Sequence, residues 1–368
     1  MHDERTAARY HRIRLVLDGI GIALGAAFIL IVVFAGGGLA LASVAARVSE
    51  NRWWQVAFIA GALAVGHAVL LFPLRYLRGF VLPRRYGLLH QPFASWLGDR
   101  LKAAALGAVF GLLVIEAIEL LLALTSLWWL VAAAFVIALS ALTAAIFPIW
   151  ILPLFYRLTP LEDASLRDRL LALAARAGVP AVGVFVVDES RKSRTANAAL
   201  AGLGRTRRIV LFDTLVSQFQ PREIESVLAH ELGHHVHRDV ARGLAAQSVI
   251  AVVTFWLADV ILRATAGTVG PVAPSDPAGI PWLVAVLGAL GFIAVPIANF
   301  LSRRVERQAD DFALAMTGDA AGFIGAMERL AELNLARMTP SRLEEIVLYS
   351  HPSVGRRIAR ARALTANA

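Results

Sequence analysis

The stretch AHELGH at residues 229–234 places two histidines, His230 and His234, four positions apart, with Glu231 between them. On an α-helix, residues four apart lie one above the other on one face, so both imidazole rings can reach one metal ion. A carboxylate beside that ion can take the proton of an attacking water. The stretch therefore predicts a helix with two zinc ligands and a general base, and it requires a third ligand elsewhere in the chain.

The rest of the chain is unusually apolar. Of its 368 residues, 58% are hydrophobic, which is too many for a soluble protein of this length. The chain has no cysteine, so a metal must be held by histidine or carboxylate side chains. Apolar runs of about 20 residues or more, the length of a membrane-spanning helix, predict six spans. They cover about residues 15–45, 53–74, 103–124, 127–150, 243–264 and 281–301.

The charge is distributed unevenly between the predicted spans. The net charge is +9, and the basic residues gather in the segments 1–14, 75–102, 151–242 and 302–368, whereas residues 265–280 contain no lysine or arginine. Cytoplasmic loops are the basic ones in membrane proteins, so these four segments are expected in the cytoplasm. This distribution explains the positive charge without a nucleic-acid partner. The alanine- and arginine-rich composition indicates a bacterial chain, which would lie in the inner (plasma) membrane.

These patterns predict a mainly α-helical multi-pass membrane protein, capped by a cytoplasmic α+β zinc-metallopeptidase domain with a small sheet. The sheet would use residues 182–187, 196–203 and 208–212, beside helices at 161–177 and from Pro221 onward. Four segments result: an N-terminal membrane domain of four spans (1–150), a cytoplasmic segment with the histidines (151–242), a transmembrane hairpin (243–301) and a second cytoplasmic segment that completes the site (302–368).

The third metal ligand is expected in the last segment, because the hairpin 243–301 returns the chain to the cytoplasmic side. Glu306 and Asp310 lie four apart on an expected helix over 303–316 and therefore share a face. Our hypothesis is that Glu306 binds the metal and that Asp310 orients a metal-bound histidine. In the alternative, both carboxylates only pair with Arg303 and Arg307 on a solvated helix.

Several short motifs, in this order along the chain, resemble the type 1 CAAX prenyl protease family. These proteins are integral-membrane zinc metallopeptidases whose spans enclose a hydrated chamber. The resemblance rests on RTANA (194–198), RIVLFDTL (208–215), HELGH (230–234), ERQAD (306–310) and SHP (350–352), with RYG (85–87), Gln91, PLF (153–155) and TPL (159–161) in support. It covers most of the chain, from the second span to the end.

The resemblance implies roles for individual residues. His230, His234 and Glu306 would bind one Zn²⁺ per chain, and Glu231 would be the general base. The expected activity is that of a membrane-embedded zinc metalloendopeptidase acting on C-terminal or membrane-associated peptides, which are possibly lipidated. The oligomeric state is not predicted.

It also implies substrate contacts. Asn197 and Ala198 would lie on a strand edge that pairs with an extended peptide. His351 and Arg357 would lie in the cleft and contact the substrate carbonyl or stabilise the oxyanion. The residues alone favour plainer interpretations, in which Asn197 is a turn residue and His351 with Pro352 begins a helix over 352–365.

Two departures from the family pattern leave the substrate open. The chain has six predicted spans where eukaryotic members have seven, and Ser353 replaces the second proline of the family's His-Pro-Pro motif. A heat-shock-type membrane quality-control metalloprotease is one alternative, although four spans before the histidines favour the prenyl-protease type. An inactive membrane scaffold or transporter is a second alternative, which the intact set of histidines and glutamates disfavours.

Overall fold

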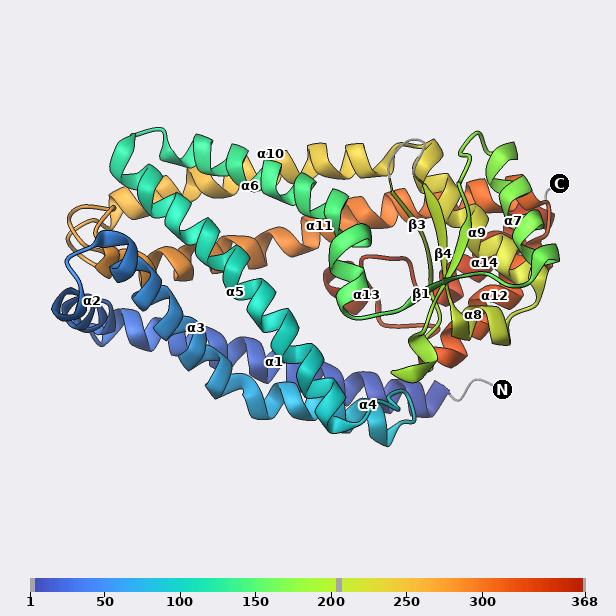
Figure 1. Cartoon of the computed structure of the whole chain (residues 1–368), viewed down its shortest axis with the longest axis horizontal. Helices are drawn as coiled ribbons and strands as arrows, with labels where there is room; N and C mark the ends of the chain where they lie inside the picture. Colours follow the sequence, from blue (N-terminus) through green and yellow to red (C-terminus); the bar gives the residue numbers. More distant parts are fainter. Residues whose placement is uncertain (1–3, 203–206, 367–368) are drawn as a thin grey trace.

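The computed structural model describes residues 4–202 and 207–366, and it is elongated (Figure 1). Long helices run side by side along its length. A unit of one small sheet and several shorter helices occupies one end, and both chain termini lie near that end. Within the described residues, six helices are long and apolar enough to cross a membrane, as predicted.

The membrane helices follow the predicted spans with shifted ends. Gly36, in the left-handed backbone region at φ 73°, divides the expected span 15–45 into two helices. The helices are α1 (Glu4–Phe34), α2 (Gly37–Val48), α3 (Arg52–Tyr76), α4 (Leu82–Arg85), α5 (Phe93–Leu124), α6 (Trp128–Ile146), α10 (Asp239–Ala264) and α11 (Ile280–Thr317). Short π-helical turns over Leu77–Val81 and Phe147–Ile151 follow α3 and α6.

The sheet-containing unit carries the predicted strands and one that was not predicted. Its elements are β1 (Leu158–Pro160), α7 (Ala164–Arg176), β2 (Val184–Val187), β3 (Ala198–Ala201), β4 (Arg208–Phe212), α8 (Asp213–Gln218), α9 (Pro221–Val236), α12 (Ala320–Leu333), α13 (Arg342–Leu348) and α14 (Val354–Ala366). The four strands form one sheet in the order β1-β2-β4-β3, in which β2 and β4 are parallel and the other pairs antiparallel. Leu203, the last residue of the expected third strand, lies outside the described residues.

Helix α9 forms where the sequence places its start. Pro221 is its first residue, and the side chains of Gln220 and Glu223 cap each other's backbone in a capping box. Leu228 and Leu232 on one face of α9 are fully buried, and they pack with Leu170 of α7 and with the sheet in one hydrophobic core. This core fixes α9, and with it the two histidines, against the sheet.

Helix α11 corrects one expectation. A span ending at Leu301 and a separate helix from Arg303 were predicted, but one helix runs without a break from Ile280 to Thr317. No glycine or proline lies between Pro296 and Thr317, so nothing in the sequence stops the helix where the chain becomes polar. The apolar half and the polar half with Glu306 are therefore parts of one continuous helix, which contains Pro296 in its interior.

Three carboxylates at membrane depth contact residues of other helices. The Asp18 carboxylate of α1 accepts from Arg78 at 3.2 Å, and the buried Glu119 of α5 pairs with Arg52 of α3 at 3.1 Å. Asp259 of α10 accepts from the indole of Trp128 on α6 at 2.6 Å. A charge in the membrane is costly without a partner. For these three carboxylates, helix–helix contact is the role that the structure shows.

A buried lysine joins the membrane helices to the sheet-containing unit. Lys192 is 6% exposed, and its Nζ lies 2.7 Å from Oδ2 of Asp99 on α5 and 4.1 Å from the ring centre of Tyr156. Its backbone carbonyl accepts from the amides of His90 and Gln91 in the segment before α5. Gln91 also donates to Asp99 at 2.7 Å. The pair of Lys192 and Asp99 thus brings together two parts of the sequence motifs that had no predicted role. These are Gln91 and the PLF segment that ends at Phe155.

Replacing this lysine should destabilise the junction. We expect Lys192→Met to lower the free energy of unfolding by about 3–5 kcal/mol, because the partly buried Asp99 then lacks its close cation. Lys102→Met is the matched control, since Lys102 faces the same carboxylate at 3.8 Å but is exposed, and it should change stability by less than about 1 kcal/mol. Thermal unfolding in detergent measures both, and equal shifts would show that the buried pair has no special role.

Candidate active site

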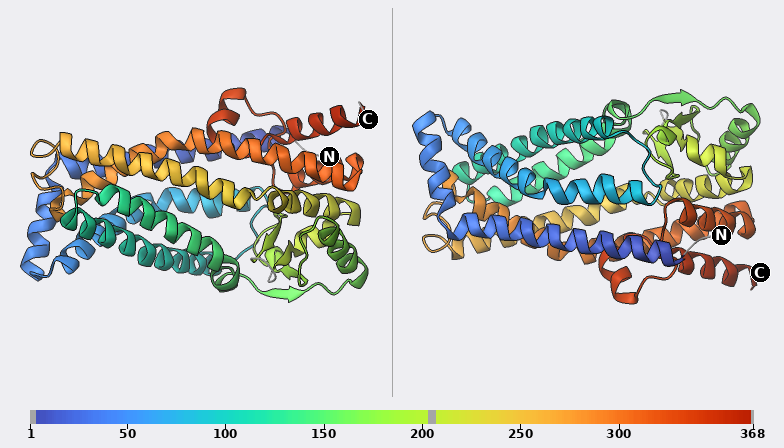
Figure 2. Two further views of the ribbon diagram at one scale, coloured as in Figure 1. Left: turned by 90° about the horizontal axis from the view of Figure 1, so that it is seen from above. Right: turned by 90° about the horizontal axis from the view of Figure 1, so that it is seen from below.

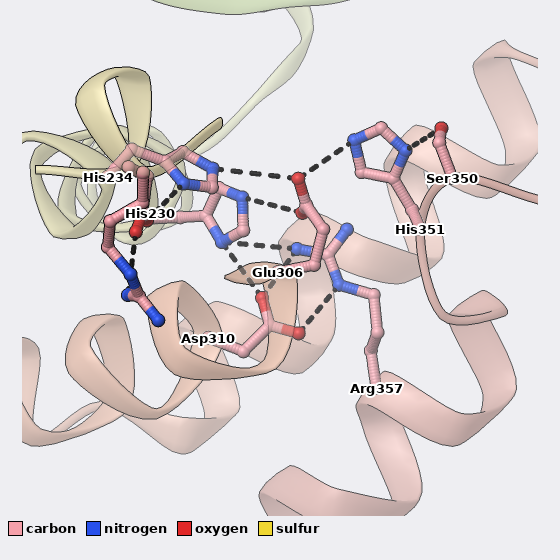
Figure 3. A network of polar contacts seen from close by, with 9 residues as sticks. His230, His234, Glu306, Asp310, Ser350, His351 and Arg357 are labelled. Carbon is pink, nitrogen blue, oxygen red and sulfur yellow. Dashed lines mark hydrogen bonds and ion pairs between the residues drawn. The ribbon is translucent and has the colours of Figure 1, made fainter. Parts of the chain in front are cut away.

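The site forms where α9 and α11 pack closely. Gly233 lies within the histidine stretch on α9, and a Cβ atom there would lie only 3.1 Å from Cα of Ala309 on α11. A glycine at this position lets the two helices approach each other. His230 and His234 of α9 then face Glu306 of α11, although 72 residues separate His234 from Glu306 (Figure 3). The predicted return of the chain by the hairpin is confirmed.

The three side chains have the geometry of a metal site. Nε2 of His230 lies 3.2 Å from Oε2 of Glu306, and Nε2 of His234 lies 3.6 Å from Oε1. Tetrahedral zinc with bonds of about 2.0–2.1 Å holds its ligand atoms about 3.3 Å apart. Ligand atoms of all three residues lie within 4.8 Å of one another. Although His230 is near, Oε2 of the buried Glu306 accepts no hydrogen bond in the described structure. A metal ion at this point would be the missing partner of that oxygen. The donor set fits zinc.

Each histidine is oriented by a carboxylate on its other ring nitrogen. Nδ1 of His230 lies 2.9 Å from Oδ1 of Asp310, and Nδ1 of His234 lies 3.0 Å from Oδ2 of Asp239. A proton held at Nδ1 leaves Nε2 unprotonated and facing the metal position. Asp310 thus lies within reach of His230, and its role in orienting a metal-bound histidine stays a prediction. Asp239 was not identified, because its reach depends on the chain reversal at Arg238, whose φ of 55° no local pattern indicates.

Two further predicted residues reach the site from the C-terminal segment. Nε2 of His351 lies 3.1 Å from Oε1 of Glu306, and its Nδ1 lies 2.8 Å from the Ser350 hydroxyl (Figure 3). Arg357, on α14, donates to both oxygens of Asp310 at 2.9 and 2.6 Å. Its Nη2 also lies 3.3 Å from His230 Nδ1, and its Nη1 makes no hydrogen bond to the described residues. His351 is exposed, whereas Arg357 is mostly buried.

One edge of strand β3, next to the histidine helix, is not paired with another described strand, although the backbone of Leu200 is hydrogen-bonded to the His235 side chain. In the described part of the chain it pairs only with β4, with Ala198 opposite Leu211, and it packs against α9. Asn197 immediately precedes β3. Its carbonyl accepts from the amide of Phe212 and its side chain accepts from the Ala198 amide. Asn197 and Ala198 thus stand at the start of an unpaired strand edge, the kind of edge to which an extended peptide can add.

Glu231 lies among the charges of the site. Burial raises the pKa of its carboxyl, and the neighbouring His230 and His234 lower it by a smaller amount. A raised pKa makes a carboxylate a better proton acceptor near neutral pH. Glu306 on the facing helix adds to the rise. The environment of Glu231 therefore suits proton transfer.

Two adjacent aspartates, Asp310 and Asp311, allow the orientation of His230 to be tested against the loss of a surface charge. We expect Asp310→Asn to weaken zinc binding by about 10- to 100-fold, because Nδ1 of His230 loses its carboxylate. Asp311→Asn is the control: Asp311 pairs with Arg360 at 2.6 Å on the exposed side of the same helix, and its loss should leave zinc affinity unchanged. Competition with a chromogenic chelator measures both affinities. A normal zinc affinity in Asp310→Asn would remove Asp310 from the site.

The chain matches the sequence profiles of two families. The profile of peptidase family M48 matches residues 160–365, more than half of the chain. The profile of the CAAX prenyl protease N-terminal region, which has five membrane helices, matches residues 3–157. Together the profiles cover the membrane helices and the unit that holds the histidines and Glu306.

Similar proteins come from bacteria and yeasts. The uncharacterized metalloprotease YhfN of Bacillus subtilis (strain 168) is 27% identical over 360 residues, which cover 96% of this chain and 84% of that protein. CAAX prenyl protease 1 of Saccharomyces cerevisiae is 30% identical over 319 residues, covering 81% and 70%. The crystal structure of S. mikatae Ste24p has a TM-score of 0.84 at 26% identity and covers 97% and 87%. The chain therefore belongs to peptidase family M48, and it is a multi-pass membrane zinc metallopeptidase that resembles CAAX prenyl protease 1.

Proposed function

We propose that this protein hydrolyses peptide bonds at a single zinc ion held by His230, His234 and Glu306, on the cytoplasmic side of a bacterial inner membrane. The observation that carries the proposal is the convergence of these three side chains beside the edge of β3 that no described strand pairs with. When bound, the zinc ion would polarise the scissile carbonyl and make the attacking water more acidic. The proposal retains the four segments predicted from the sequence, which end at residues 150, 242, 301 and 368.

The chain's own residues supply the other steps. Glu231 takes the proton of the attacking water and passes it to the leaving amine. The edge of β3, from Asn197 and Ala198 onward, holds the substrate backbone extended. His351 and Nη1 of Arg357 donate to the carbonyl oxygen as negative charge develops on it. The two bonds from Arg357 to Asp310 hold its guanidinium in place for this task.

The proposed substrates are C-terminal or membrane-associated peptides, including lipidated ones, and not nucleic acid. CAAX prenyl protease 1 of yeast is named for prenylated substrates, and this name suggests the first one to test. Purified protein would be given a farnesylated CAAX peptide and the same peptide without the farnesyl group. Faster cleavage of the farnesylated peptide supports the prenyl-protease type, equal cleavage supports a quality-control protease, and no cleavage of either contradicts the proposal.

The role of His351 can be tested separately. We expect His351→Ala to lower kcat by about 10²- to 10³-fold, the usual effect of removing one oxyanion donor, while zinc content stays unchanged. Ser350→Ala is the control, because it removes only the hydroxyl bonded to Nδ1 of His351 and should have a much smaller effect. Full turnover by His351→Ala would end the catalytic assignment of this residue.

A further inference from the structure

A cavity of about 360 Å³ is lined in part by Asp310 and Arg357. Three helices line it: α11, α13 and α14. Pocket volumes of about 300–1,000 Å³ are typical of small-ligand sites. Six arginines contribute to its walls: Arg303, Arg307, Arg342, Arg356, Arg357 and Arg360.

The carboxylates around this cavity do not balance its arginines. Arg357 pairs with Asp310, Arg360 with Asp311 and Arg356 with Glu345. Arg303 is buried, and among the described residues it donates to the backbone carbonyls of Glu345 and Tyr349 alone, at 3.1 and 2.6 Å.

Arg307 and Arg342 form no ion pair with the described residues, and both are exposed. Six positive charges against three negative ones leave a net charge of +3 around one small cavity. Guanidinium groups held together in this way repel one another unless an anion lies between them.

We propose that this arginine pocket binds a phosphate-bearing anion. Arginine is the side chain best suited to phosphate, because its planar fork donates two parallel hydrogen bonds to two phosphate oxygens. A phosphate monoester brings a charge of about −1.5 to −2 at neutral pH, whereas a peptide carboxylate brings −1, so phosphate matches the excess charge better.

From its position, the pocket could take the phosphate of a lipid headgroup or a soluble phosphate. Phe300 lines the pocket at the point where the apolar part of α11 gives way to a run of arginines, and basic pockets at the cytoplasmic ends of membrane helices bind lipid headgroups. The same chemistry would accept a soluble phosphate. Because Arg357 and Asp310 form one wall, the anion would lie next to the groups that orient His230.

The test compares two neighbouring arginines on α11. Arg307 lines the pocket, whereas Arg304 lies over the ring of Phe300 at 4.7 Å and does not line it. Neither Arg307 nor Arg342 has a carboxylate partner in the part of the chain that the structure describes, so the double variant Arg307→Gln/Arg342→Gln should fold. Binding of inorganic phosphate is measured by calorimetry on the zinc-loaded protein in a nonionic detergent at constant ionic strength. Binding of phosphatidic acid, against phosphatidylcholine, is measured by native mass spectrometry.

We expect wild type and Arg304→Gln to bind alike and the double variant to bind about tenfold more weakly or worse. Retention of phosphatidic acid without affinity for inorganic phosphate identifies a lipid as the source, and the reverse identifies a soluble anion. Equal binding by the double variant, or no binding of either probe to wild type, would overturn the proposal. The measurement is anion binding, so its outcome is independent of peptide hydrolysis.

Discussion

Glu231→Gln is expected to slow peptide hydrolysis strongly while the protein keeps its zinc. The substitution preserves the size of the side chain and removes the group that accepts a proton, and general-base catalysis contributes about 10²- to 10⁴-fold to rates. His230, His234 and Glu306, which converge on the metal position, are untouched. The kcat of the variant should therefore fall by about that factor, with zinc content near that of wild type by elemental analysis.

A control on the same helix makes this result specific. Glu225 lies on the solvent side of α9 and pairs with Arg169 of α7 at 2.8 Å. Glu225→Gln makes the same chemical change six residues away and should leave kcat and zinc content unchanged. Equal rates in wild type and Glu231→Gln would contradict the proposed role of Glu231.

The sequence was sufficient to bring the two histidines of the candidate metal site together, because their spacing is periodic. His230 and His234 lie one helical turn apart, and Pro221 marks where their helix begins. Apolar runs longer than about 20 residues can be recognised without tertiary information, so the six spans were also found. The clustered arginines also predict which side of the membrane each segment faces, and this stays a prediction. Glu306 could be predicted only by combining the histidine spacing with the spans, since the hairpin of spans determines which later carboxylates can meet the histidines.

The contacts that depend on close packing were not predictable in this way. Asp239 reaches His234 only because Arg238 adopts a left-handed conformation that lets α10 begin at once. The pairing of Lys192 with Asp99 joins residues 93 positions apart, and neither has a local pattern that indicates a partner. Strand β1 has only three residues, Leu158–Pro160, and is defined by its pairing with β2 and not by its composition.

The continuous helix α11 connects the membrane helices to the candidate active site. Its apolar half packs among the membrane helices and its polar half carries Glu306 and Asp310. Glu306 provides one carboxylate to three histidines at once, with His351 at 3.1 Å in addition to His230 and His234. Because this carboxylate links elements from three parts of the chain, its removal should have a larger effect than any other substitution on α11.

We therefore expect Glu306→Ala to lose both zinc and activity. Two histidines alone leave the metal with one protein ligand fewer than a catalytic zinc site requires. The loss of affinity should exceed the roughly 10- to 100-fold effect expected for Asp310→Asn, which changes only the orientation of His230. Zinc per chain after dialysis, measured by elemental analysis, distinguishes the two variants, and Asp311→Ala on the same helix should keep its zinc.

A second measurement separates loss of the ligand from loss of the fold. Glu306 is buried between α9 and α11, and its carboxylate lies within 3.1–3.6 Å of ring nitrogens of His230, His234 and His351, so replacing it with alanine removes these contacts as well as the ligand. The metal-free variant should therefore unfold at a temperature no higher than metal-free wild type, whereas zinc should raise the unfolding temperature of wild type only. If zinc still stabilised Glu306→Ala, the ion would be held by other residues, and Glu306 would not be a zinc ligand. If the variant kept its zinc but lost activity, Glu306 would act on the substrate and not on the metal.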